Sequence, residues 1–101
     1  MYEEVIMKAN ITNLRKALKT CAKAHNAKFS DWACEGQLGV WSTTPGTICD
    51  VRMICEAFFG HSDAVEVCHD VNCITIWLCY EYQPVVDEQT MYMALPYGTK
   101  L

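Results

Sequence analysis

The seven cysteines of this 101-residue chain limit the folds it can adopt more than any other feature. No two of them are separated by two residues, the spacing that redox and zinc motifs use. Their number is odd, and the opening stretch, residues 1–8, has no apolar run as long as a secretory signal needs. We therefore expect reduced thiols that pack as small apolar side chains in a cytoplasmic protein, without a disulfide framework. The cysteines are Cys21, Cys34, Cys49, Cys55, Cys68, Cys73 and Cys79.

Length and hydropathy predict one domain over residues 1–101. With 51% hydrophobic residues, a chain of this length buries about two-thirds of the surface that its unfolded form exposes, so it needs no cross-link to fold. The longest late apolar run, residues 74–80, is too short to cross a bilayer. We expect no contact with a membrane.

Charge is separated along the chain, which has a net charge of −4. Residues 1–30 carry six of the eight basic side chains, and residues 31–101 carry ten of the twelve acidic ones. Such a separation can steer a partner into contact or let two copies meet head to tail, so a homodimer is one expectation. Because the chain as a whole is acidic, we do not expect it to bind nucleic acid directly.

The clearest helix is predicted over residues 11–27, where apolar side chains recur every three or four positions as far as Phe29. Asn10 is the expected N-cap. The opposite arc is a basic helix face, which we interpret as solvated surface because no aromatic residue is interleaved with the bases. The basic helix face consists of Arg15, Lys16, Lys19 and Lys23.

The remaining pattern predicts strands around a second helix. A strand over residues 37–43 precedes a Pro45-Gly46 turn, and Thr47 with Asp50 resembles a capping box that opens a helix ending at Gly60. A hairpin is predicted over residues 64–82, with short strands at residues 2–8, as an edge strand, and at residues 90–95. We expect an α+β fold: a single two-layer domain with two helices packed on one face of a mostly antiparallel four- to five-stranded sheet.

The second arm of the hairpin has two distinct faces. Ile74 and Ile76 alternate with Trp77 and Glu81, so the helices should cover the isoleucines and leave the tryptophan on the other face, with Trp41 as a neighbour on an adjacent strand. Exposed tryptophans on a sheet are typical of binding anchors. The expected partner-binding residues are Trp41, Trp77 and Glu81. A third layer or a second copy of the chain covering this face is the alternative.

Two groups of cysteines offer chemistry. Cys68 and Cys73, with His69 and either His61 or Cys79, gather around the hairpin, but they supply one ligand pair where zinc sites use two. We expect buried thiols there and no metal.

Cys49 lies in the first turn of the second helix, where the helix dipole favours a thiolate, although Asp50 opposes it. A reactive thiol at Cys49 is therefore kept as an alternative prediction.

No motif in the chain identifies a reaction, so we expect a binding module with no catalytic residue and no cofactor. The predicted function is to dock on a larger protein or protein complex and to inhibit or adapt it. An acidic surface can compete for a groove that holds a phosphate backbone, which favours an inhibitor of host defence or of nucleic-acid-targeting machinery, of the kind that mobile elements encode. The alternative is a thiol-dependent small enzyme or small-molecule binder that uses Cys49 or the Cys68/Cys73 pair.

Overall fold

The structure, a computed structural model, describes residues 2–8, 11–78 and 90–96, with side chains for residues 11–78. Two helices and six strands follow one another in the order β-α-β-β-α-β-β-β. Their bounds are β1 Tyr2–Lys8, α1 Ile11–Ala24, β2 Lys28–Trp32, a short 3-10 turn η1 Ala33–Glu35, β3 Gln37–Trp41, α2 Pro45–Phe59, β4 Val65–Cys68, β5 Cys73–Trp77 and β6 Thr90–Pro96.

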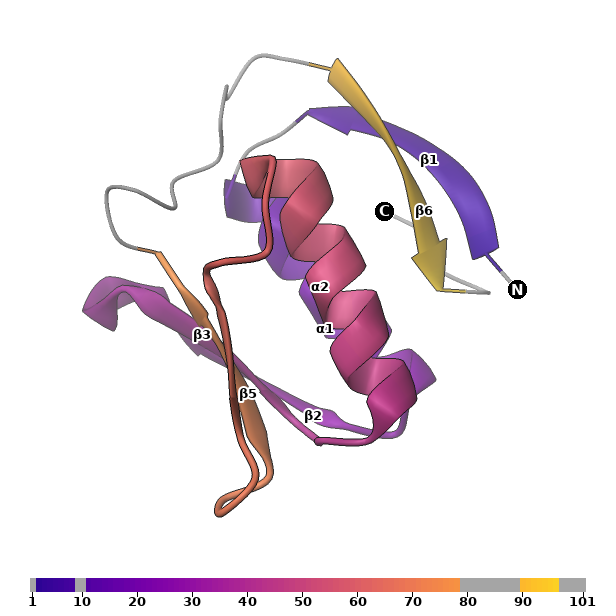
Figure 1. The fold of residues 1–101 in the computed structure, drawn as a ribbon. Coiled ribbons are helices and arrows are strands. Elements are labelled where there is room, and N and C mark those ends of the chain that lie inside the picture. Colours follow the sequence, from indigo (N-terminus) through magenta and orange to yellow (C-terminus); the bar gives the residue numbers. More distant parts are fainter. Residues whose placement is uncertain (1, 9–10, 79–89, 97–101) are drawn as a thin grey trace.

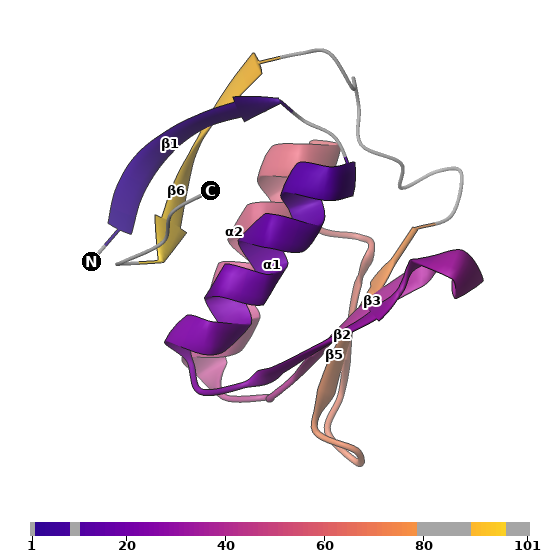
Figure 2. The ribbon, with the colours of Figure 1, turned by 180° about the vertical axis from the view of Figure 1, so that it is seen from behind.

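Four of the strands form an antiparallel sheet in the order β2-β3-β5-β4, and both helices pack on one face of it. The expected α+β fold is confirmed. The strand at residues 2–8 is also confirmed, but its partner differs from the expected sheet: β1 pairs antiparallel with β6, so that Tyr2 lies opposite Pro96. This two-stranded ribbon lies across the helices from the sheet (Figures 1 and 2).

The core lies between the helices and the inner face of the sheet. The expected inward face of β5 is correct, because Ile74 and Ile76 are fully buried. Each buried side chain of this size contributes about 1.5–3 kcal/mol through removal of apolar surface from water. The other large, fully buried side chains include Leu14 and Leu18 of α1, Val51, Ile54 and Phe58 of α2, and Leu38 and Val40 of β3.

Helix α2 begins three residues earlier than the sequence predicts, because its N-cap is Thr44 and not Thr47. Pro45 occupies the first turn, where its fixed φ suits a helix and its missing N–H costs no bond, and Thr44 is the N-cap residue. The proposed capping box is therefore wrong: the Thr47 hydroxyl bonds to the Thr44 hydroxyl at 2.8 Å. The predicted end is confirmed, since Gly60 is left-handed with φ 83° and its N–H donates to the Glu56 carbonyl at 2.8 Å.

Helix α1 ends at Ala24, short of the predicted residue 27, and the chain turns through Asn26, whose φ is 54°. A strand that the sequence did not predict follows at once. Phe29 belongs to this strand, β2, and not to the helix, although it still packs against the core. The sequence Lys-Phe-Ser-Asp-Trp alternates too weakly in polarity to mark an edge strand by itself.

The predicted hairpin is confirmed as β4 and β5, with a turn over residues 69–72 in which Asn72 has φ 52°. Strand β5 ends at Trp77, and the backbone N–H of Leu78 donates to the Gly36 carbonyl at 2.7 Å. The predicted continuation through residues 79–82 lies outside the described residues.

Candidate functional site: the outer sheet face and three side-chain clusters

All three tryptophans of the chain lie on the face of the four-stranded sheet that points away from the helices. In β3, Leu38 and Val40 are buried against the helices, so Gln37 and Trp41 point to the opposite side. Gln37 pairs with Trp32 of β2 on one side and with Trp77 of β5 on the other. Because paired residues of neighbouring strands point to the same face of a sheet, both tryptophans lie on the face of Gln37. We call this surface, made by Trp32, Gln37, Trp41 and Trp77, the outer face.

Trp32 and Trp41 form a rigid pair on the outer face. Their rings meet edge to face, with centroids 5.8 Å apart and planes at 87°. The indole Nε1–H of Trp41 donates to Ser30 Oγ at 2.7 Å, which satisfies the polar group of that ring.

The Trp32 ring lies over Gly39 of β3, where an added Cβ would be tightly packed against it. A Cβ placed on Gly39 would lie 3.1 Å from Cζ3 of Trp32 and 3.5 Å from Sγ of Cys73. Cys73 points away from the helices but is nevertheless buried, with its Sγ atom next to Gly39. Burial is also the main cause that raises the pKa of the Cys73 thiol above its ordinary value.

The sequence placed Trp41 and Trp77 on one face, and the strand register agrees. It did not place them correctly relative to each other: Trp77 lies opposite Gln37, four positions along β3 from Trp41. The neighbour of Trp41 is Trp32, which the sequence analysis missed because strand β2 was not predicted. Glu81, the third predicted partner-binding residue, lies outside the described residues.

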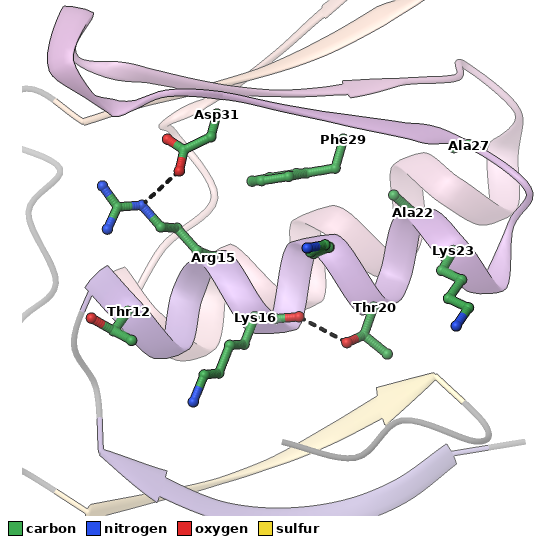
Figure 3. Close-up of a pocket in the computed structure, with 10 residues that line it drawn as sticks. Thr12, Arg15, Lys16, Thr20, Ala22, Lys23, Ala27, Phe29 and Asp31 are labelled. Atoms are coloured by element: carbon green, nitrogen blue, oxygen red, sulfur yellow. Dashed lines mark hydrogen bonds and ion pairs between the residues drawn. The ribbon is translucent and has the colours of Figure 1, made fainter.

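The basic helix face borders a groove between α1 and β2 (Figure 3). Its volume is about 810 Å³, with Phe29, Ala22 and Ala27 among the apolar side chains that line it. Arg15 turns toward Asp31 and pairs with it at 3.1 Å, whereas Lys16 and Lys23 extend away from that pair (Figure 3). The groove also takes in Lys19, so all four residues of the basic helix face line it.

Cys49 is exposed on α2, as a reactive thiol would have to be, but it is the fifth residue of the helix and not in its first turn, where the sequence placed it. It lines a shallow hollow of about 500 Å³ together with Arg52, which is three residues further along α2, and His69, which the sequence gave no reason to place beside it. The hollow brings a thiol, a guanidinium and an imidazole to one part of the surface. Among the other thiols, Cys68 and Cys73 are register partners across the hairpin, as predicted, and His69 stands in the turn.

A third cluster joins the two helices. Cys21 and His25 are four residues apart at the C-terminal end of α1 and so face the same way, toward Asp50 of α2. A ring nitrogen of His25, Nε2, lies 2.6 Å from Oδ2 of Asp50, whose side chain is only 5% exposed. Burial, with a further contribution from the Asp50 carboxylate, raises the pKa of the Cys21 thiol to about 12.

Sequence reasoning missed this cluster because it assigned its members to other roles. Cys21 and His25 were placed on the buried arc of α1, and Asp50 was interpreted as part of a helix cap. Among residues 11–78, Cys21, His25 and Asp50 are the one group of three metal-ligating side chains whose donor atoms lie close enough to hold a metal ion. The thiols of the hairpin do not belong to this group.

No protein-family model, curated protein or solved structure significantly matches this chain. Within the described residues, neither helix has the length and apolar character needed to cross a membrane. Function must therefore be argued from the surfaces and clusters themselves.

Proposed function

We propose that this chain is a protein-binding module that docks on a larger protein through the outer face of its sheet. The observation that supports the proposal is the exposed indole of Trp77, 37% accessible, on the same face as the rigid Trp32/Trp41 pair. Tryptophan is the residue type most enriched among interface residues that carry large binding energies, because it buries a large, rigid surface with little loss of side-chain entropy.

The polar residues around the indoles indicate which chemical groups the partner must present. Glu66 of β4 is exposed and pairs with Thr75 on the side of the sheet where Trp77 lies, while Lys28 pairs with Trp41 at the far end. A matching surface has an apolar pocket for Trp77 and a basic group near Glu66. In its narrower form, the proposal is an inhibitor whose acidic surface competes with a phosphate backbone for a basic groove on nucleic-acid-targeting machinery.

Affinity capture with matched variants tests the proposal. The tagged full chain is used to recover partners from the native host, beside Trp77→Ala, Trp41→Ala and the control variants Met53→Ala and Val71→Ala. Met53 and Val71 are exposed apolar residues at 41% and 56%, on α2 and in the hairpin turn. A protein recovered by the parent chain and by both controls, but lost with Trp77→Ala, is the expected result. Recovery with both tryptophan variants would contradict the proposal.

Sedimentation of the same variants separates a larger partner from a second copy of the chain. A monomeric parent chain agrees with the proposal. A dimer that Trp77→Ala converts to monomer would mean that a second copy covers the outer face, which would replace the larger partner.

The hollow at Cys49 favours a second candidate function, a thiol-dependent enzyme or small-molecule binder. Arg52 and His69 are groups that can stabilise a thiolate or accept its proton. Cys34 is an exposed thiol outside this hollow and serves as the control. This candidate predicts that iodoacetamide modifies Cys49 much faster than Cys34 at neutral pH, and that His69→Ala removes the difference. Equal rates would dismiss it.

A further inference from the structure

The cluster of Cys21, His25 and Asp50 brings three metal-ligating side chains together where α1 and its end meet α2. Each offers one donor atom, and the three donor atoms all lie within 4.8 Å of one another. Cys21 is fully buried and Asp50 nearly so, whereas 24% of the His25 side chain remains accessible. The cluster is therefore enclosed on the helix side and open to solvent at the histidine.

We propose that Cys21, His25 and Asp50 bind one divalent transition-metal cation of the zinc type, which clamps α1 to α2. A thiolate, an imidazole and a carboxylate are the three ligand types that zinc accepts, whereas magnesium and calcium require oxygen ligands. Zinc bound by three protein ligands keeps a fourth position for water, and the partial exposure of His25 shows that the cluster is not fully closed to solvent.

The geometry requires only a small adjustment. Metal–ligand distances of about 2.0–2.3 Å and tetrahedral angles place neighbouring donor atoms about 3.2–3.8 Å apart. The 2.6 Å contact between His25 and Asp50 is a hydrogen bond, so it must open by roughly 1 Å to admit the cation between the two side chains. No donor–donor distance exceeds 4.8 Å, so the longest must shorten by at most about 1.6 Å, and rotations of the His25 and Cys21 side chains would have to supply both movements.

The charges balance when the cation binds. The thiol of Cys21 releases one proton to solvent and becomes a thiolate, and Asp50 binds as a carboxylate. The proton that His25 Nε2 shares with Asp50 moves to Nδ1 through solvent, so that His25 binds through Nε2 as a neutral imidazole. A divalent cation with these two anionic ligands leaves a neutral site, which suits the burial of Cys21 and Asp50. The site is separate from the outer face, since its residues come from the helices on the other side of the sheet.

Titration with cobalt(II), a spectroscopic probe for zinc sites, tests the proposal on the full chain after removal of metal with a chelator. We expect one equivalent of cobalt to produce a thiolate-to-cobalt charge-transfer band and the visible bands of four-coordinate cobalt. Cys21→Ser should abolish the charge-transfer band. Cys34→Ser and Cys49→Ser remove exposed thiols that could bind cobalt by chance, and should leave the band unchanged. The absence of the band in the parent chain, or its survival in Cys21→Ser, would overturn the proposal.

Thermal unfolding gives a second measurement that does not depend on the folding of the Cys21 variant. Zinc should raise the unfolding midpoint of the parent chain and of His61→Ala, because a cation that binds only the folded state stabilises it. Magnesium should have no such effect. His25→Ala should weaken zinc binding at least about tenfold, judged from the zinc concentration needed for the same shift. An equal shift in His25→Ala and His61→Ala would place the zinc elsewhere and refute the site.

Discussion

Asp50 shows how a buried carboxylate pairs with a side chain that comes from the other helical segment. Its side chain is 5% exposed and lies 2.6 Å from the imidazole of His25. A charged group taken out of water at this depth must be paired, because its lost hydration costs several kcal/mol. The pair therefore fixes how α1 and α2 meet at this end of the helices.

Replacing Asp50 tests this dependence in the metal-free protein. Asp50→Ala should lower the free energy of unfolding by about 2–3 kcal/mol, since it leaves His25 without its partner and opens a gap between the helices. Asp31→Ala is the matched control: its pair with Arg15 is 38% and 45% exposed, so its loss should cost under about 1 kcal/mol. Urea titration of both variants measures the two costs. Equal losses of unfolding free energy in the two variants would show that the buried pair stabilises the fold no more than the surface pair does.

At the scale of elements, the outer face depends on Gly39 of β3, because the missing side chain leaves room for the Trp32 ring. Gly39 lets the Trp32 ring lie against the strand, with Cζ3 of the ring 3.1 Å from where a Cβ would stand. The Sγ atom of the buried Cys73, on the neighbouring strand, lies 3.5 Å from the same point. The arrangement of the tryptophans thus depends on a glycine that no binding argument from sequence would have selected.

Gly39→Val should displace the Trp32 ring and cost about 1–3 kcal/mol of unfolding free energy through overpacking. The diagnostic signal is tryptophan fluorescence, which should shift toward that of a more solvated indole. Gly36→Ala is the control. Its φ of 79° makes a side chain there unfavourable by roughly 1 kcal/mol, but the space around it is open, so tryptophan emission should stay unchanged. Unchanged emission in Gly39→Val would mean that Trp32 does not rest on β3.

Elements whose apolar residues recur at a regular spacing were predictable from the sequence. Elements that depend on contacts with distant parts of the chain were not. Both helices follow from apolar residues at helical spacing, and β5 follows from the alternation around Ile74 and Ile76, because burial of one face dictates those patterns. Strand β2 has no such pattern, since Phe29 packs on the core while Asp31 pairs with Arg15 and Ser30 accepts a hydrogen bond from Trp41. The Cys21–His25–Asp50 cluster needed the packing of α1 on α2, which sequence spacing alone does not give.

The whole molecule places its two helices between a sheet and a ribbon made from both ends of the described chain (Figures 1 and 2). Strand β6 packs on both α1 and α2, and β1 joins it in antiparallel register. The helices are thus contacted on two sides, which encloses thiols such as Cys55 in α2. The free energy of unfolding of the whole chain should therefore fall at alkaline pH, where those thiols would ionise in the unfolded state.

Alkaline pH tests this enclosure. Burial, and then the nearby Cys21 thiol, raise the pKa of Cys55 above its ordinary value, whereas the unfolded chain releases that proton near pH ~8.5. Above this pH the unfolded state binds fewer protons than the folded state, so the free energy of unfolding falls as pH rises, by about 1.4 kcal/mol per pH unit for each such thiol. Between about pH 9 and 10, Cys55→Ala should remove about that much of the slope. Cys34→Ala, at an exposed thiol, should leave the slope unchanged. Urea titrations with a chelator present measure each slope, and identical slopes for the two variants would show that Cys55 ionises as readily in the folded chain as in the unfolded one.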